Sequence, residues 1–235
     1  MYLQSLAALA ATGLMTAGAQ GALISFAADS NPNEPTLLSQ FDAGSKITSI
    51  FDRGPTMLEL LTDPDEDGPL GPVFTSVAMS LGFTMEHVDS RQIFPGFWSH
   101  TFSVVGDFEF RDVNTDELLY RGATGEGGGV FVGLGSATKI MSGSISAFDA
   151  TYDIGALGAA IVGFGGTNLL GDFGFTLTSI NNGSGAMLAF ENGDVVGIQD
   201  FIAESSFSGS FIPTPGFTAL ASIAGLVALR RRRDR

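Results

Sequence analysis

The sequence contains no cysteine, so this chain can form no disulfide, no thiolate metal site and no cysteine nucleophile. His87 and His100 are the only histidines, too few to complete a histidine-rich zinc site by themselves. The chain also lacks a Gly-x-Ser-x-Gly motif, the sharp turn that presents a serine nucleophile in many hydrolases. Because these common catalytic centres are missing, we expect a protein that is not an enzyme.

Basic residues are scarce, with 11 Lys and Arg against 25 Asp and Glu and a formal net charge of −14. Five of the eleven bases accompany the single acid Asp234 at the C-terminus: Arg230, Arg231, Arg232, Arg233 and Arg235. The rest of the chain therefore has six bases and 24 acids, a net charge of about −18. A surface this negative repels phosphate backbones, so nucleic-acid binding is not expected.

The residues that are abundant favour β-structure. The chain has 32 Gly and 20 Phe but only one Trp and three Tyr, and 44% of its residues are apolar. Glycine without a collagen period is typical of many turns, and phenylalanine packs well on pleated strands. The composition therefore predicts many short strands around a buried core.

Alternation of apolar and polar residues supports this prediction. Residues 100–111 place Phe102, Val104, Phe108 and Phe110 on one face of a strand, and Asn114–Asp116 follows as a turn. Asn192-Gly193 between two apolar runs is a strong hairpin signal. We expect an all-β fold, an antiparallel β-sandwich or barrel of about ten to twelve strands. Further strands are predicted at 23–26, 37–41, 47–51, 73–87, 130–134, 139–148, 173–179 and 206–211.

Two segments of the body are harder to assign. No stretch has a sustained 3.6-residue pattern with caps, and Met57–Leu61 is at most a short helix. The Gly-rich apolar run Ile154–Gly166 lacks the Lys-Ser/Thr of a phosphate-binding loop. We interpret it as a buried strand with glycine bends.

The N-terminus has the pattern of an export signal. Residues 3–19 are small and apolar, and Ala17 and Ala19 occupy the −3 and −1 positions that a signal peptidase accepts. No Lys or Arg precedes Lys46, so the usual positive start of such a signal is missing. We expect residues 1–19 to form a signal helix that is removed, and residues 20–212 to form one extracytoplasmic domain.

The C-terminus combines three features in order. Pro213-Thr214-Pro215 forms an extended, accessible segment, because two prolines stop any strand or helix. The 13 apolar residues Phe217–Leu229 follow, about 20 Å long as a helix, which is short for a bilayer core of about 30 Å. Four consecutive arginines then hold the end on the cytoplasmic side: Arg230, Arg231, Arg232 and Arg233. This order is typical of a segment that pauses in the membrane and is then cut off.

These residues resemble the PEP-CTERM sorting signal that exosortases recognise. The resemblance covers about residues 212–235, and Thr214 stands where the usual signal has Glu. It implies cleavage near Pro215 by a membrane-embedded, exosortase-like transpeptidase after the signal peptidase has acted. It also implies a protein that is membrane-anchored before processing and is then released or attached at the cell surface. Contact with extracellular polysaccharide is implied by the resemblance alone.

Several polar residues of the body are candidates for binding or chemistry. Asp63, Asp65 and Asp67 open like an EF-hand loop, but Phe74 stands where the closing Glu would be. They form either a calcium site or a solvated acidic turn. Asp107 and Glu109 share a strand face, as glycosidase carboxylates sometimes do. Trp98 could stack on a sugar or fill a turn. His87 or His100 could serve a catalytic triad.

Three functions follow from these observations. The first is a non-enzymatic surface or extracellular-matrix protein. The second is a carbohydrate- or calcium-binding module that rests on Trp98 and the acidic turn. The third is an exported hydrolase that rests on the carboxylates.

Overall fold

The computed structural model describes residues 21–27, 37–52, 56–65 and 69–213. Of these residues, 72% lie in strands and 4% in helix. The elements along the chain are β1 (Ala22–Ala27), β2 (Leu37–Asp42), β3 (Ile47–Asp52), β4 (Thr56–Asp63), β5 (Val73–Phe94), β6 (Phe97–Asp112), β7 (Leu118–Ala123), β8 (Gly129–Ser136), β9 (Lys139–Ile154), α2 (Ala156–Val162), β10 (Gly166–Thr178), β11 (Ala186–Glu191), β12 (Asp194–Ile198) and β13 (Ile202–Phe211).

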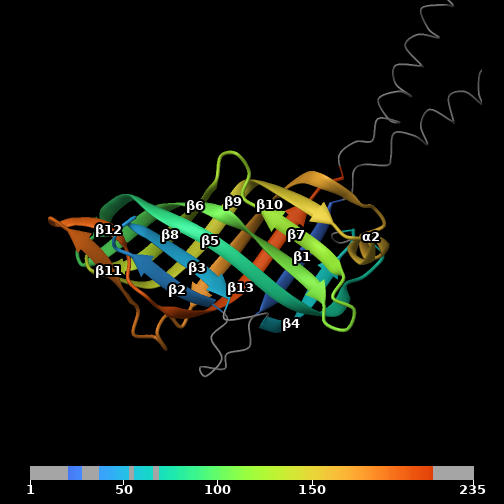
Figure 1. Cartoon of the computed structure of the whole chain (residues 1–235), viewed down its shortest axis with the longest axis horizontal. Coiled ribbons are helices and arrows are strands. Elements are labelled where there is room, and N and C mark those ends of the chain that lie inside the picture. Colours follow the sequence, from blue (N-terminus) through green and yellow to red (C-terminus); the bar gives the residue numbers. More distant parts are fainter. Residues whose placement is uncertain (1–20, 28–36, 53–55, 66–68, 214–235) are drawn as a thin grey trace, which may run out of the picture.

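All strand pairs are antiparallel and belong to one sheet of 13 strands, so the prediction of an antiparallel all-β fold is confirmed. The number of strands is one above the predicted range. The sheet closes on itself, because β1 pairs with both β4 and β13, and β5 pairs with β6. The result is a barrel-shaped sheet rather than two packed sheets (Figure 1).

The strands differ in length, and this organises the two ends of the closed sheet. Strands β5, β6, β9, β10 and β13 contribute to both ends. Short strands complete each end: β1, β4 and β7 at one, and β2, β3 and β8 at the other. We call the first the α2 end, because α2 packs against β7 and β4 there. The second is the hairpin end, where the hairpin β11–β12 lies.

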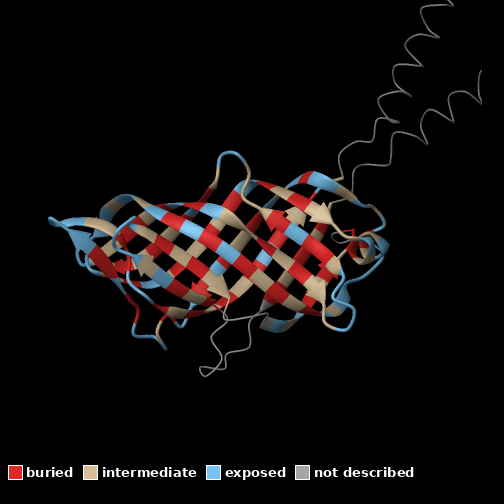
Figure 2. Cartoon of the chain, in the orientation of Figure 1, coloured by how far each residue is buried: buried red, intermediate tan, exposed pale blue. Residues whose placement is uncertain are grey.

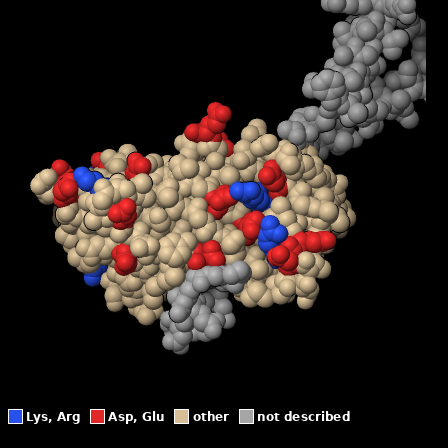
Figure 3. Space-filling model, viewed as in Figure 1, with Lys and Arg blue, Asp and Glu red and all other residues tan. Residues whose placement is uncertain are grey.

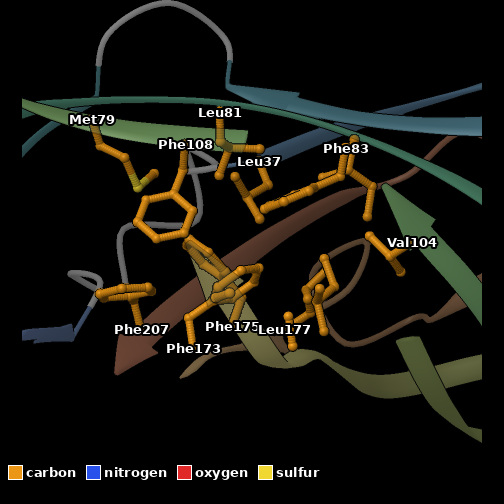
Figure 4. Packing of buried hydrophobic residues seen from close by; sticks show 14 of the residues in the cluster. Leu37, Met79, Leu81, Phe83, Val104, Phe108, Phe173, Phe175, Leu177 and Phe207 are labelled. Atoms are coloured by element: carbon orange, nitrogen blue, oxygen red, sulfur yellow. The ribbon is translucent and has the colours of Figure 1, made fainter. Parts of the chain in front are cut away.

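The interior is filled by aromatic side chains. Along the strands, buried residues alternate with more exposed ones (Figure 2). Phe207 lies 4.8 Å from Phe175 and 5.0 Å from Phe108, measured between ring centroids, and Figure 4 shows these rings pointing toward one another. Glycine makes room for them: a Cβ at Gly122 would lie 2.3 Å from the Phe108 ring. At this position the absence of a side chain on glycine leaves the space that a phenylalanine ring occupies.

The two turns predicted from the sequence are confirmed, and residues in both have positive φ angles. Asn192 and Gly193, between β11 and β12, have φ angles of 52° and 95°, as a two-residue hairpin needs. The turn at Asn114–Asp116 joins β6 to β7, which pair as a hairpin. Asp116 in this turn has a φ of 59°.

Two predictions about local structure were wrong. Met57–Leu61 belongs to strand β4, because its side chains alternate in exposure and it is held between β1 and β5. Ile154–Gly166 is not a strand with glycine bends: it contains the seven-residue helix α2. Gly155 precedes that helix and Gly163 ends it with a φ of 79°, so glycines delimit the helix rather than bend a strand.

Candidate functional site

Most residues of the predicted signals lie outside the described residues. This holds for Ala17 and Ala19 of the signal helix, and for six residues of the sorting segment: Thr214, Pro215, Arg230, Arg231, Arg232 and Arg233. Pro213 is the last residue that the structure describes. Among the described residues, no helix has both the length and the apolar character that a membrane span requires. The export and sorting signals therefore remain predictions.

The structure does describe where these two segments join the body. Ala22 at the start of β1 lies directly opposite Phe211 at the end of β13. Both side chains are buried. On the other edge of β13, the amide of Ile212 donates to the carbonyl oxygen of Leu170 in β10 at 3.1 Å. The first and last described residues of the body therefore lie beside each other, at the α2 end.

The acidic turn after β4 buries one carboxylate. Asp65 is only 6% exposed; its Oδ2 accepts a hydrogen bond from the Leu70 amide at 3.0 Å. Its Oδ1 is buried and has no hydrogen-bond partner among the described residues. Asp63 Oδ1 accepts from the Asp65 amide at 3.3 Å, and Asp67 lies outside the described residues. The described residues contain no group of three or more His, Asp and Glu that could hold a metal.

Asp107 and Glu109 lie on the outer face of β6 and are both paired with arginines. Asp107 pairs with Arg121 of β7, and Glu109 Oε1 accepts from Arg111 Nε at 2.8 Å. The hydrogen bond from Arg111 is the main reason that the pKa of Glu109 is lowered. Figure 3 shows basic side chains beside acidic ones on this face of the molecule.

These carboxylates line a shallow depression of about 320 Å³, together with Ser80, Gly82 and Arg121. A glycosidase of the common type needs one carboxyl group whose pKa is raised, so that it holds a proton to donate. Glu109 has the opposite shift, and Arg121 neutralises Asp107. The arrangement does not favour the hydrolase hypothesis.

The two histidines come together, although the sequence places them 13 positions apart. Ser90 Oγ lies 2.8 Å from Nε2 of His87 and 2.7 Å from Nδ1 of His100. His100 is fully buried, and its Nε2 donates to the carbonyl oxygen of Ser136 at 2.8 Å. No carboxylate hydrogen-bonds either ring among the described residues, so the group lacks the third member of a catalytic triad.

Sequence reasoning missed this His87–Ser90–His100 cluster, which needs the β5–β6 hairpin to form. The Pro95-Gly96 dipeptide between the two strands is a turn signal from which this hairpin could have been predicted. Folding the chain back at this turn places Ser90 opposite His100. The missing information was the register of the hairpin.

Trp98 lies in β6 and not in a turn. Its ring is half-buried and stacks on the His100 ring, with centroids 6.3 Å apart and planes at 6°. Phe94 and Phe97 stack at the hairpin tip, 4.7 Å apart at 7°. The imidazole of His100 is therefore a parallel neighbour of the indole of Trp98.

Comparisons of this chain with family models, curated proteins and solved structures find no match. The resemblance of the C-terminus to a sorting signal therefore rests on the residues of that segment alone.

Proposed function

We propose that this chain is an exported, non-enzymatic protein of the cell surface or extracellular matrix, sorted by its C-terminal segment. The observation that carries the proposal is the pairing of Ala22 with Phe211. An export signal before β1 and a membrane-arrested segment after β13 would both leave the body at the α2 end. The folded body would then lie on one side of the bilayer while its tail is cut.

The architecture of the body supports a passive role at the surface. The interior of the closed sheet is packed with side chains such as Phe108, Phe175 and Phe207, which leave little room for a ligand. The hairpin end is covered by β12, whose Ile198 backbone forms two hydrogen bonds with Thr48 Oγ1. Asp65 is the only buried acidic residue among those described; the others are at least partly exposed, which favours solubility.

The decisive experiment is the mass of the mature protein from an exosortase-bearing host. The proposal expects a C-terminus near Pro215 and an N-terminus near Gln20. The same chain produced in a host without an exosortase is the control and should keep its arginines. Full-length protein, Arg235 included, at the surface of the first host would reduce the segment to an ordinary anchor.

Calcium binding at the acidic turn is a second candidate function, because one buried oxygen of Asp65 has no described partner. A buried polar atom without a hydrogen bond is costly, and a bound cation would satisfy it. Asp63 is close enough in the chain for its side chain to accept from the Asp65 amide. Carboxylate oxygens are the ligands that Ca²⁺ prefers.

A further inference from the structure

One stretch of β5 has no neighbouring strand on one side. Strand β5 pairs with β6 along most of its length; on its other side it pairs with β4 up to Met79 and with β3 as far as Met85. Beyond Met85, no strand in the described ranges pairs with that side. We call Glu86–Phe94 the open edge. An antiparallel strand points alternate backbone groups to each side, so the open edge offers N–H and C=O groups to a further strand.

Strand β12 approaches one end of the open edge without pairing with it. A depression of about 310 Å³ lies at this approach. It is lined by Glu86 and His87 of β5, Val195 and Val196 of β12, and Ser45 and Lys46. The residues from Val88 onward lie beyond this depression. Val88, Ile93 and Phe94 are 62%, 52% and 56% exposed, an unusual amount of apolar surface for one short segment.

Beyond the depression, residues Val88–Phe94 of the open edge carry one charge of each sign on their outer face. Asp89 lies opposite Thr101 of β6 and Arg91 opposite Ser99, and both charged residues are exposed. None of the three ion pairs found among the described residues includes Arg91. A β-bulge between His87 and Asp89 precedes this regular segment. Charges and bulges usually protect an edge from pairing, but opposite charges two positions apart are also self-complementary.

We propose that the open edge binds a second copy of this chain, by antiparallel pairing of the two edges about Ser90. A two-fold axis at Ser90 places Asp89 of each copy opposite Arg91 of the other, so two ion pairs form. The interface uses the same patch twice, as two-fold dimers do.

The charges select this register over its neighbours. Pairing centred on Asp89 would oppose two aspartates, and pairing centred on Arg91 would oppose two arginines, both of which are unfavourable. Registers between these would set inward-facing residues opposite outward-facing ones, because side chains alternate along a strand. In this register Asp89 and Arg91 of a second copy complement Arg91 and Asp89 of the first, so the open edge is complementary to itself.

The test exchanges charges in the exported protein, purified in the form that cells produce and studied by sedimentation velocity. Asp89→Arg should oppose arginines, and Arg91→Asp should oppose aspartates, so each should raise the dimer dissociation constant about tenfold or more. An equal mixture of the two variants should restore association, because arginines on one copy then meet aspartates on the other. The chain with both substitutions should dimerise like the wild type.

Glu126→Arg provides the matched control, because it makes the same change of charge at an exposed residue between β7 and β8. It should leave the dissociation constant unchanged. A wild-type protein that stays monomeric at all concentrations overturns the proposal, as does a mixture that associates no better than the single variants. If the single variants do not fold, the double variant decides, and its failure to dimerise overturns the proposal. A monomer whose only tryptophan, Trp98, changes fluorescence with phosphatidylcholine vesicles would assign the edge to lipid instead.

Discussion

His87 and His100 share a single hydroxyl group, that of Ser90. A carbonyl oxygen only accepts hydrogen bonds, so neutral His100 carries its proton on Nε2, where it donates to Ser136. Its Nδ1 then accepts from Ser90, and Ser90 Oγ accepts from Nε2 of His87. With both rings neutral, every one of these contacts is satisfied.

This arrangement predicts that stability falls in mild acid. Burial is the main cause that lowers the pKa of His87 below 6.5; the charge of His100 acts in the same direction, while Asp89 and Asp194 oppose it. A histidine with a lowered pKa in the folded state takes up its proton more readily when unfolded. The free energy of unfolding should therefore be highest above about pH 6.5 and fall as the pH drops through the folded pKa.

Urea unfolding at a series of pH values measures this effect. For one proton the slope cannot exceed about 1.4 kcal/mol per pH unit, and partial exposure of His87 should keep it well below that. His87→Gln keeps a donor toward Ser90 but does not titrate, so the part of the slope due to His87 should disappear. Glu109, whose pKa is lowered, acts in a separate window below 4.5. A wild-type protein as stable at about pH 5 as at about pH 7.5 contradicts the prediction.

A second prediction concerns close approach between β10 and β13. A Cβ at Gly171 would lie 2.1 Å from the backbone oxygen of Ser210, whereas a Cβ at Gly174 would have only ordinary contacts, the nearest at 3.8 Å. Gly171→Ala should therefore lower the free energy of unfolding by about 1–3 kcal/mol, because backbone must move. Gly174→Ala, three residues along the same strand, should change it by less than about 0.5 kcal/mol. Equal effects of the two substitutions in denaturant unfolding would refute this packing.

Much of the fold could be predicted because its signals are local. The alternation around Phe102–Phe110 and the Asn192-Gly193 turn each act within a few residues, and both are confirmed. Helix α2 was missed because a seven-residue helix between glycines shows too few turns for a helical period to appear. The closure of the sheet depends on pairs such as Ala22 with Phe211, which no local pattern reveals.

The histidine cluster was missed for a more specific reason. Before the bulge, His87 pairs with Phe102; after it, Asp89 pairs with Thr101 and Ser90 with His100. Without the extra residue Ser90 would lie opposite Ser99, and its side chain would point to the face opposite that of His87. One bulge therefore creates the cluster, and composition does not indicate where a bulge falls. The pairing of Asp107 with Arg121 depends in the same way on the register of β6 and β7.

If the acidic turn binds calcium, the melting temperature should rise at about millimolar Ca²⁺, because a ligand that binds only the folded state stabilises it. Asp65→Asn combined with Asp67→Asn should abolish the rise while leaving the melting temperature in EDTA within a few degrees of the wild type. Glu126→Gln, which removes an exposed carboxylate elsewhere, should keep the rise. A wild-type protein that shows no rise would mean that the acidic turn does not bind calcium.

The arginine tail should be needed for orientation at the membrane. The variant that tests this has Gln at four positions, Arg230, Arg231, Arg232 and Arg233, and so loses four positive charges, each worth about 1 kcal/mol near an anionic leaflet. It should pass through the membrane or be sorted wrongly, and it should carry an uncut C-terminus. Lysine at the same four positions keeps the charge and should support processing. Fractionation of cells with mass analysis of the C-terminal peptide measures both variants, and normal processing of the Gln variant would show that charge is not required.

The prolines should be needed for cleavage but not for retention in the membrane. Pro213 follows strand β13 by two residues and is half-buried, so the segment between the body and the apolar stretch is short. Two prolines keep this segment from joining either a strand or a helix and leave its backbone accessible to an enzyme. Pro213→Ala with Pro215→Ala should therefore block processing, while the apolar stretch and the arginines still hold the uncut protein in the membrane fraction. Pro72→Ala, a substitution in the body, is the control and should be processed normally. If the double variant is cut as efficiently as the wild type, the prolines are not needed for cleavage and the role assigned to them is wrong.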